Sequence, residues 1–422
     1  MLLSDLPSDV LDDIANSVAV IDGHSVRSLA LVSQAFRRPS QRRLFASITL
    51  IVRLNASYDP LIPPRQHVLL RDILKENPVL ATYTLALQCV QFDTSQWGRL
   101  GLSDLVSGSA NQWMLDHGVL VAEILQLLAA SPIQALTVFN GPVDNLLDWS
   151  TLHPSLQASF LRLFSIPTLL FVSLSGFSLP RNIFNTFIDL KRLILGNFGW
   201  SSDNVLSPSD IHVIGQRIHR LSSLCLEMST ALPIESIGSG IGLDLSELSI
   251  LTLNISTIPP PNLVPFISVP NLKKLTISIL CPAEEGHDGL YLDLGLTIAL
   301  RDLILSCETN ISVKAFSWID LFLSTLPANS PIENFSLKLK IYRDPFTPTD
   351  FGAFDVLGKA LARLHHGFIG IKKIQLKMDL HCPMVKMSPE VVQQFWEQMR
   401  ENLLWKGCED VLILQLGTST SS

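Results

Sequence analysis

The stretch that decides the fold is LKKLTI at residues 272–277, in which an aliphatic residue occupies the first, fourth and sixth positions. Comparable segments are LKRLIL at 190–195, LSILTL at 248–253 and LRDLIL at 300–305. Because side chains alternate between the two faces of a strand, the last two aliphatic residues of each segment point into a core and the residue between them points outward. Each segment therefore predicts a short strand with one buried face.

Roughly ten such segments lie between residues 80 and 417, and the stretches between them predict helices. Residues 210–218 and 354–362, for example, have the spacing of amphipathic helices. Strands that alternate with helices indicate a parallel sheet. The spacing of the segments varies from 24 to 39 residues, as the first core residue of successive strands shows: Leu193, Leu224, Leu251, Leu275, Leu303, Phe335 and Ile374.

Most of these segments fit Leu-x-x-Leu-x-Leu and resemble the strand half of a leucine-rich repeat. One such unit does not cover its own apolar edge and must stack on its neighbour. The sequence therefore predicts an α/β protein in which an irregular leucine-rich-repeat solenoid has a curved parallel sheet.

The exposed strand face of such a solenoid is the natural surface for binding another protein. Its predicted positions mix small polar and aliphatic residues, which suits recognition better than catalysis: Thr137, Ser173, Ile194, Cys225, Thr252, Thr276, Ile304, Ser336, Gln375 and Ile413. We expect the substrate-binding residues to be the aliphatic Ile194 and Ile304 together with a basic patch of Lys338, Lys340, Lys373 and Lys377. The alternative is that these four lysines are scattered and merely solvated.

The N-terminal fifty residues predict three short helices. The first begins at Pro7, whose missing N–H costs nothing there. Ser25 is a candidate cap for the second helix, and Pro39 is the expected start of the third. A module of this size buries too little apolar surface to be comfortably stable alone, which indicates a partner.

This module resembles an F-box, because LPSDVL at 6–11, LALVSQAFRR at 29–38 and RRLF at 42–45 occur in the right order. The resemblance implies docking onto a Skp-type adaptor and, through it, onto a cullin-RING ubiquitin ligase. The order of modules resembles fungal F-box proteins with degenerate repeats. Carried over by position, the adaptor-binding residues are Leu6, Pro7, Val10, Leu11, Ile14, Leu29, Val32, Phe36, Leu44 and Phe45.

Composition is consistent with these modules. The 422 residues are 47% hydrophobic and 16% charged, enough for a large core. The net charge of −7 argues against a nucleic-acid binder. Neither an export signal nor a membrane span is expected, so the predicted location is cytoplasmic or nuclear, and six dispersed cysteines indicate reduced thiols. The expected domains are an F-box at 1–50, a connecting segment or first irregular repeat at 51–79, the solenoid at 80–417 and a polar tail at 418–422.

No catalytic, cofactor or metal site is expected. The DFG tripeptide at 350–352 lacks the other kinase motifs, the glycines at 238–242 lack a phosphate-binding lysine, and His365, His366 and His381 lack further metal ligands at suitable spacing. The favoured function is substrate recognition for a ubiquitin ligase. A repeat scaffold whose F-box-like segment does not bind the adaptor is the alternative, and a hydrolase hidden in an α/β fold is the weakest hypothesis.

Overall fold

A computed structural model describes the chain over residues 6–54, 64–93, 117–139, 146–180, 182–201, 219–228, 243–255, 269–280, 294–309, 313–327, 330–342, 352–368, 370–381, 389–403 and 411–419. The chain divides into two compact units, residues 1–219 and 220–422. The predicted helix at 210–218, the glycines at 238–242 and most of the proline-containing stretch at 58–65 lie outside the described residues.

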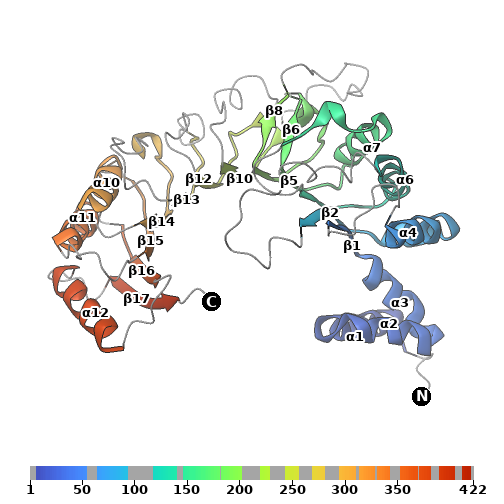
Figure 1. Cartoon of the computed structure of the whole chain (residues 1–422), viewed down its shortest axis with the longest axis horizontal. Helices are drawn as coiled ribbons and strands as arrows, with labels where there is room; N and C mark the ends of the chain where they lie inside the picture. Colours follow the sequence, from blue (N-terminus) through green and yellow to red (C-terminus); the bar gives the residue numbers. More distant parts are fainter. Residues whose placement is uncertain are drawn as a thin grey trace. The chain divides into compact units, whose positions relative to one another are not determined.

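The first unit begins with three helices and continues with alternating strands and helices (Figure 1). Its elements are α1 (Ser8–Ile21), α2 (Gly23–Val32), α3 (Gln34–Phe45), β1 (Ser47–Leu54), α4 (Arg65–Glu76), η2 (Pro78–Tyr83), β2 (Ala86–Asp93), α6 (Gly118–Leu128), β3 (Ala135–Phe139), β4 (Leu147–Asp148), η4 (Trp149–Thr151), α7 (Pro154–Phe164), β5 (Phe171–Ser175), β6 (Phe177–Leu179), η5 (Ile183–Thr186), β7 (Arg192–Gly196) and β8 (Gly199–Trp200).

The second unit repeats the alternation of strand and connecting segment. Its elements are β10 (Ser223–Met228), β11 (Leu243–Asp244), β12 (Ile250–Ile255), β13 (Lys274–Leu280), η6 (Leu294–Leu296), β14 (Asp302–Thr309), α10 (Val313–Ser324), β15 (Asn334–Tyr342), α11 (Gly352–Gly367), β16 (Lys373–His381), α12 (Pro389–Leu403) and β17 (Leu412–Ser419); β9 (His219–Arg220) contains the boundary between the units.

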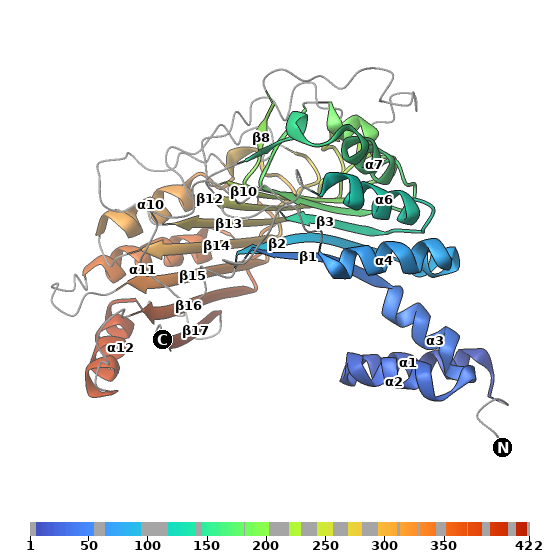
Figure 2. The ribbon, with the colours of Figure 1, turned by 45° about the vertical axis from the view of Figure 1, so that its right-hand side comes forward.

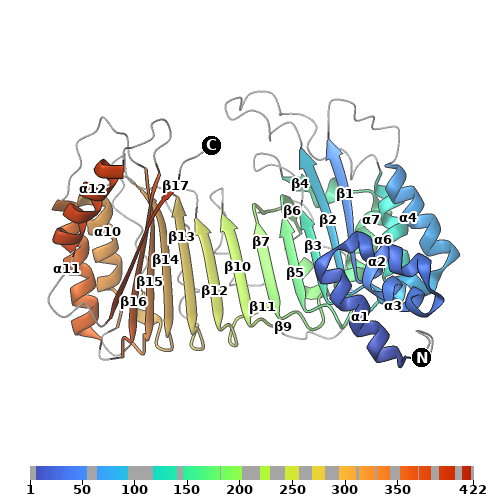
Figure 3. The same cartoon turned by 90° about the horizontal axis from the view of Figure 1, so that it is seen from below.

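Both units are built on parallel strands that follow one another in sequence order. In the first unit the order is β1-β2-β3-β5-β7, with β4-β6-β8 forming a small second sheet. In the second unit the order is β10-β12-β13-β14-β15-β16-β17. Figure 3 shows the strands of each unit lying side by side. The predicted α/β class with a parallel sheet is confirmed.

Helices cover one face of the strands within each unit, α4, α6 and α7 in the first and α10, α11 and α12 in the second (Figure 1). Under them, the core residues of successive strands form continuous buried rows. Leu275, Leu303 and Phe335 occupy the same position in β13, β14 and β15, and each is at most 1% exposed. The alternation expected from the sequence is therefore observed, and among the described residues no helix covers the other face of the strands, which we call the open face.

The aromatic residues of the first unit gather beneath its helices. Phe160 and Phe164 on α7 lie with their ring centroids 6.0 Å apart, and Trp149 and Phe187 pack against Phe164 at 6.3 and 4.9 Å. All four side chains are buried. This cluster fixes α7 on the sheet, because large rings in contact bury much apolar area per residue.

Two expected helix boundaries in the N-terminal module are wrong. The cap of α2 is Asp22 rather than Ser25: its carboxylate accepts from the backbone N–H groups of His24 and Ser25, both at 3.0 Å. These bonds, that of His24 foremost, lower the pKa of Asp22. The third helix begins at Gln34, so Pro39 lies inside α3, where it is buried.

The expected domain boundaries fall within secondary structure. Strand β1 runs across residue 50 and pairs with β2 over its whole length, and α4 follows inside the stretch 51–79. This places 51–79 with the stacked strands and helices, as in the first-repeat interpretation. At the other end, β17 extends to Ser419, beyond the expected start of the tail at 418.

We expect Leu305→Ala to lower the free energy of unfolding of the second unit by about 2–5 kcal/mol, because Leu305 is fully buried in a central strand. Ile304→Ala removes a similar volume from the open face of the same strand and is expected to cost far less. Chemical denaturation of both variants measures the difference. Equal losses would contradict the assignment of the two faces.

Candidate protein-binding surfaces

The N-terminal module has a small core. Leu11 and Ala15 on α1, Val26 on α2 and Phe36 on α3 are at most 7% exposed. The Arg42 guanidinium ties α3 to α1 through an ion pair with the Asp12 carboxylate at 2.9 Å. The ion pair is half exposed, so it orients the helices more than it stabilises them.

The module continues into the stacked strands through α3, which leads directly into β1 (Figure 2). Arg42 also lies over the ring of Tyr83 in η2, 5.9 Å from its centroid. Between the last residue of α3, Phe45, and the first of β1, Ser47, stands a single residue. So short a link leaves the module little freedom to turn against the strand it precedes.

The predicted adaptor-binding residues divide into three groups by exposure. Leu11 and Phe36, at 7% and 6% exposed, belong to the core of the module. Pro7, Val10 and Val32 are exposed, Val32 to 81%. The remaining five are half-buried: Leu6, Ile14, Leu29, Leu44 and Phe45.

Sequence reasoning missed the most exposed apolar side chains of the module. Val20 and Ile21 at the end of α1 are 82% and 83% exposed, and Leu31 beside Val32 at the end of α2 is 89% exposed. The signal was present for Val20 and Ile21, because both fall outside the stripe of α1 that includes Leu11 and Ala15. Exposed aliphatic pairs at the ends of the two helices are candidates for contact with another protein.

In the first unit, the open strand face presents Thr137, Ser173 and Ile194 in one row across β3, β5 and β7. All three point to the predicted face, but their side chains are half-buried rather than exposed. In the neighbouring row the Arg192 guanidinium lies 5.3 Å from the centroid of the Phe171 ring, a cation–π distance.

In the second unit, the predicted outward residues align without any shift in register. Cys225, Thr252, Thr276, Ile304 and Ser336 occupy one row, which β16 and β17 extend with Gln375 and Ile413. Ile304 thus lies at the centre of the row, flanked by hydroxyl groups. The row offers small hydrogen-bonding groups and two aliphatic contacts, Ile304 and Ile413, which suits an extended polypeptide.

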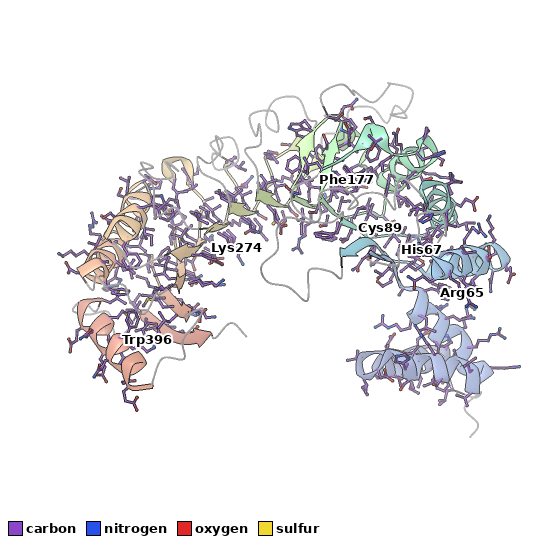
Figure 4. The ribbon with its side chains drawn as sticks, in the orientation of Figure 1. Arg65, His67, Cys89, Phe177, Lys274 and Trp396 are labelled. Carbon is purple, nitrogen blue, oxygen red and sulfur yellow. The ribbon has the colours of Figure 1, made fainter. Side chains whose placement is uncertain are left out.

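The four predicted lysines all lie on this face, on β15 and β16. Lys338 is directly opposite Lys377, and Lys340 is one row further along β15, opposite Asp379. Lys373 starts β16 opposite Asn334, in the row that contains Lys274 of β13, which is labelled in Figure 4. The structure therefore brings the four lysines onto two neighbouring strands.

Carboxylates neutralise half of this lysine group. Lys340 contacts Glu308 of β14 at 3.2 Å and Lys377 contacts Asp379 at 3.1 Å. Within the described part of the chain, no carboxylate lies within ion-pair distance of Lys338. The patch is therefore a mixed polar surface with a modest positive excess rather than a uniformly basic one.

An ion-pair network borders the same face where β15 and β16 begin. Glu333 accepts from Lys372 at 2.6 Å and lies 3.6 Å from Arg301. The hydrogen bond from Lys372, and then its charge, lower the pKa of Glu333. All three side chains face solvent, so we assign them no role in stability.

Among the described residues, no three His, Cys, Asp or Glu side chains come together as metal ligands would. In the same part of the chain, no helix has both the length and the apolar character needed to cross a bilayer. Gly352 begins α11, whereas the two residues before it in the DFG tripeptide lie outside the described residues.

No protein-family model and no curated protein sequence matches the chain. Among solved structures, the crystal structure of a TLR13–ssRNA13 complex contains a similar chain, 15% identical over 81% of this one with a TM-score of 0.29. The present chain spans about half of that protein, 52% of its length.

Burial separates the described cysteines by reactivity. Cys89 on β2, labelled in Figure 4, and Cys307 on β14 are buried, which raises the pKa of each thiol to about 12. Since the thiolate is the nucleophile, we expect iodoacetamide at about pH 8 to leave both unmodified in the native protein and to modify both after denaturation. Half-exposed Cys225 is the internal control. Peptide mass spectrometry measures the labelling, and equal labelling of Cys89 in native and denatured protein would contradict the predicted burial.

Proposed function

We propose that the chain is a substrate-recognition subunit of a Skp-cullin-F-box type ubiquitin ligase, with an F-box at its N-terminus and irregular leucine-rich repeats after it. The observations that carry the proposal are two pairs of aliphatic side chains, each side chain more than four-fifths exposed: Val20 with Ile21 at the end of α1, and Leu31 with Val32 at the end of α2. The F-box motif order in the same helices supplies the chemical class of the partner, a Skp-type adaptor.

Burial of these aliphatic side chains contributes to the free energy of docking. Burying one aliphatic side chain of this kind contributes about 1.5–3 kcal/mol. Four of them contribute an amount of the same order as the cost of association, and the other predicted adaptor-binding residues supply the rest of the contact. The three-helix core beneath them is small, so an adaptor seated there would also stabilise the module.

The stacked strands then serve as the substrate-binding part. Their open face carries aligned hydroxyl, amide and lysine groups with isolated aliphatic contacts at Ile194 and Ile304. This composition favours a protein segment as ligand, and the proposal includes no catalytic role for the chain itself. The alternative, a scaffold that does not engage the ligase, shares this face and differs only at α1–α3.

We expect the double variant Leu31→Glu/Val32→Glu to lose at least tenfold in affinity for a Skp-type adaptor, because two carboxylates replace apolar contact area. The matched control is Leu69→Glu/Val119→Glu, which changes an exposed leucine on α4 and an exposed valine on α6. Pull-down and calorimetry with purified adaptor provide the measurement. If the wild-type chain fails to bind any Skp-type adaptor, the scaffold alternative replaces the ligase proposal.

A second experiment tests the strand face. Lys338→Glu/Lys377→Glu reverses two opposed lysines, and we expect it to reduce the capture of acidic partners while adaptor binding is unchanged. The control, Lys359→Glu, reverses an exposed lysine on α11 in the helical layer. Affinity purification under proteasome inhibition, at low and high salt, measures the difference, because contacts between exposed charges weaken with salt. A set of captured proteins identical to wild type would shift attention to Ile194 and Ile304.

A further inference from the structure

Strand β17 is the last strand of the second unit and, within the part of the chain that the structure describes, pairs only with β16. The Ile374 N–H donates to the Val411 carbonyl at 3.0 Å, so the backbone groups of Val411 point toward β16. Since these groups alternate in direction along a strand, the N–H and C=O groups of Leu412 and Leu414 point to the opposite edge. That edge presents a row of donors and acceptors.

The rows of apolar core residues end at β17, and their last members are not fully buried. In β15 and β16 the first two core positions, Phe335 with Leu337 and Ile374 with Leu376, are at most 1% exposed. The register continues both rows into Leu412 and Leu414. These two leucines are only half-buried. A further strand beside β17 would complete their burial.

Sheet edges are normally protected by charged residues, proline or a covering segment. The sequence of β17, LILQLGTS at 412–419, contains neither a charged residue nor proline. By contrast, the open face of its neighbour β16 carries three charged side chains, Lys373, Lys377 and Asp379. Among the described residues, strand β17 therefore combines an edge without a partner strand, two half-buried leucines and a sequence without charge.

We propose that β17 pairs with β17 of a second copy of this chain, antiparallel, across a twofold axis perpendicular to the sheet. This axis keeps the helices of both copies on one face, as a closed symmetric dimer requires. The strand is its own complement: with Leu414 opposite its symmetry mate, Leu412 lies opposite Leu416, and Ile413 lies opposite Gln415. Other registers place fewer leucines opposite one another.

The pairing of leucine with leucine identifies a second copy of β17 as the partner strand. The incomplete rows call for leucine at alternate positions on the helical side, and β17 itself has leucine at 412, 414 and 416. Because the strand lacks charge, self-pairing brings no like charges together, despite the net charge of −7 of the chain. Pairing through one strand closes after two copies, so the predicted species is a dimer and not a fibre.

Sedimentation velocity of the full chain over a wide concentration range tests the proposal. We expect a reversible increase toward twice the chain mass of 46.6 kDa. Leu414→Lys places two ammonium groups directly opposite each other and is expected to give a folded monomer, as circular dichroism would check. The control, Leu321→Lys on α10, changes a leucine that is 44% exposed and should still dimerise.

A cross-linking measurement decides the case in which Leu414→Lys does not fold. Leu414→Cys, treated with a short bis-thiol reagent, should form a covalent dimer well above the background of the native cysteines, because residue 414 lies on the twofold axis. Leu321→Cys should not. A wild-type chain that stays monomeric at all concentrations or forms species larger than a dimer, or a Leu414→Cys variant that gives no cross-linked dimer, would overturn the proposal. None of these outcomes depends on adaptor binding.

Discussion

The register of the parallel strands is the constraint on which both units depend. Strands such as β12, β13 and β14 bury at least two aliphatic residues on one face, and these residues meet their counterparts in the next strand without a shift, as Leu251, Leu275 and Leu303 do. A slip of one residue would expose this whole row to water. The hydrophobic effect therefore fixes, at the same time, which residues remain on the open face.

Because burial of one face fixes the other, the strand register also positions the side chains of the proposed binding surface. No loop holds Ile304 or Lys338 in place; each stands between two buried neighbours in a strand paired on both sides. Such side chains are presented on a rigid backbone, which lowers the entropy lost on binding. The charge pairs on the same face, Lys340 with Glu308 and Lys377 with Asp379, then limit how much positive field the lysines produce.

Much of the strand pattern was predictable, because period-two alternation has a strong and local physical cause. The buried members Leu193 and Phe335 and the open members Thr137 and Ser336 were all assigned correctly from the sequence. The helix caps were not, since Asp22 and Ser25 are both suitable residues and only the backbone geometry decides between them. Long-range charge pairing, as between Glu308 and Lys340, leaves no trace in the sequence at all.

The unshifted rows have a consequence for how specificity can change. Neighbouring strands lie about 4.8 Å apart, and outward residues repeat about every 6.6 Å along a strand, so the open face forms a regular lattice. A substitution at Thr276 or Ser306 alters one lattice point and leaves the buried rows, and hence every other point, where they were. Recognition of a new ligand can thus evolve by independent single steps, while the segments between strands vary freely in length.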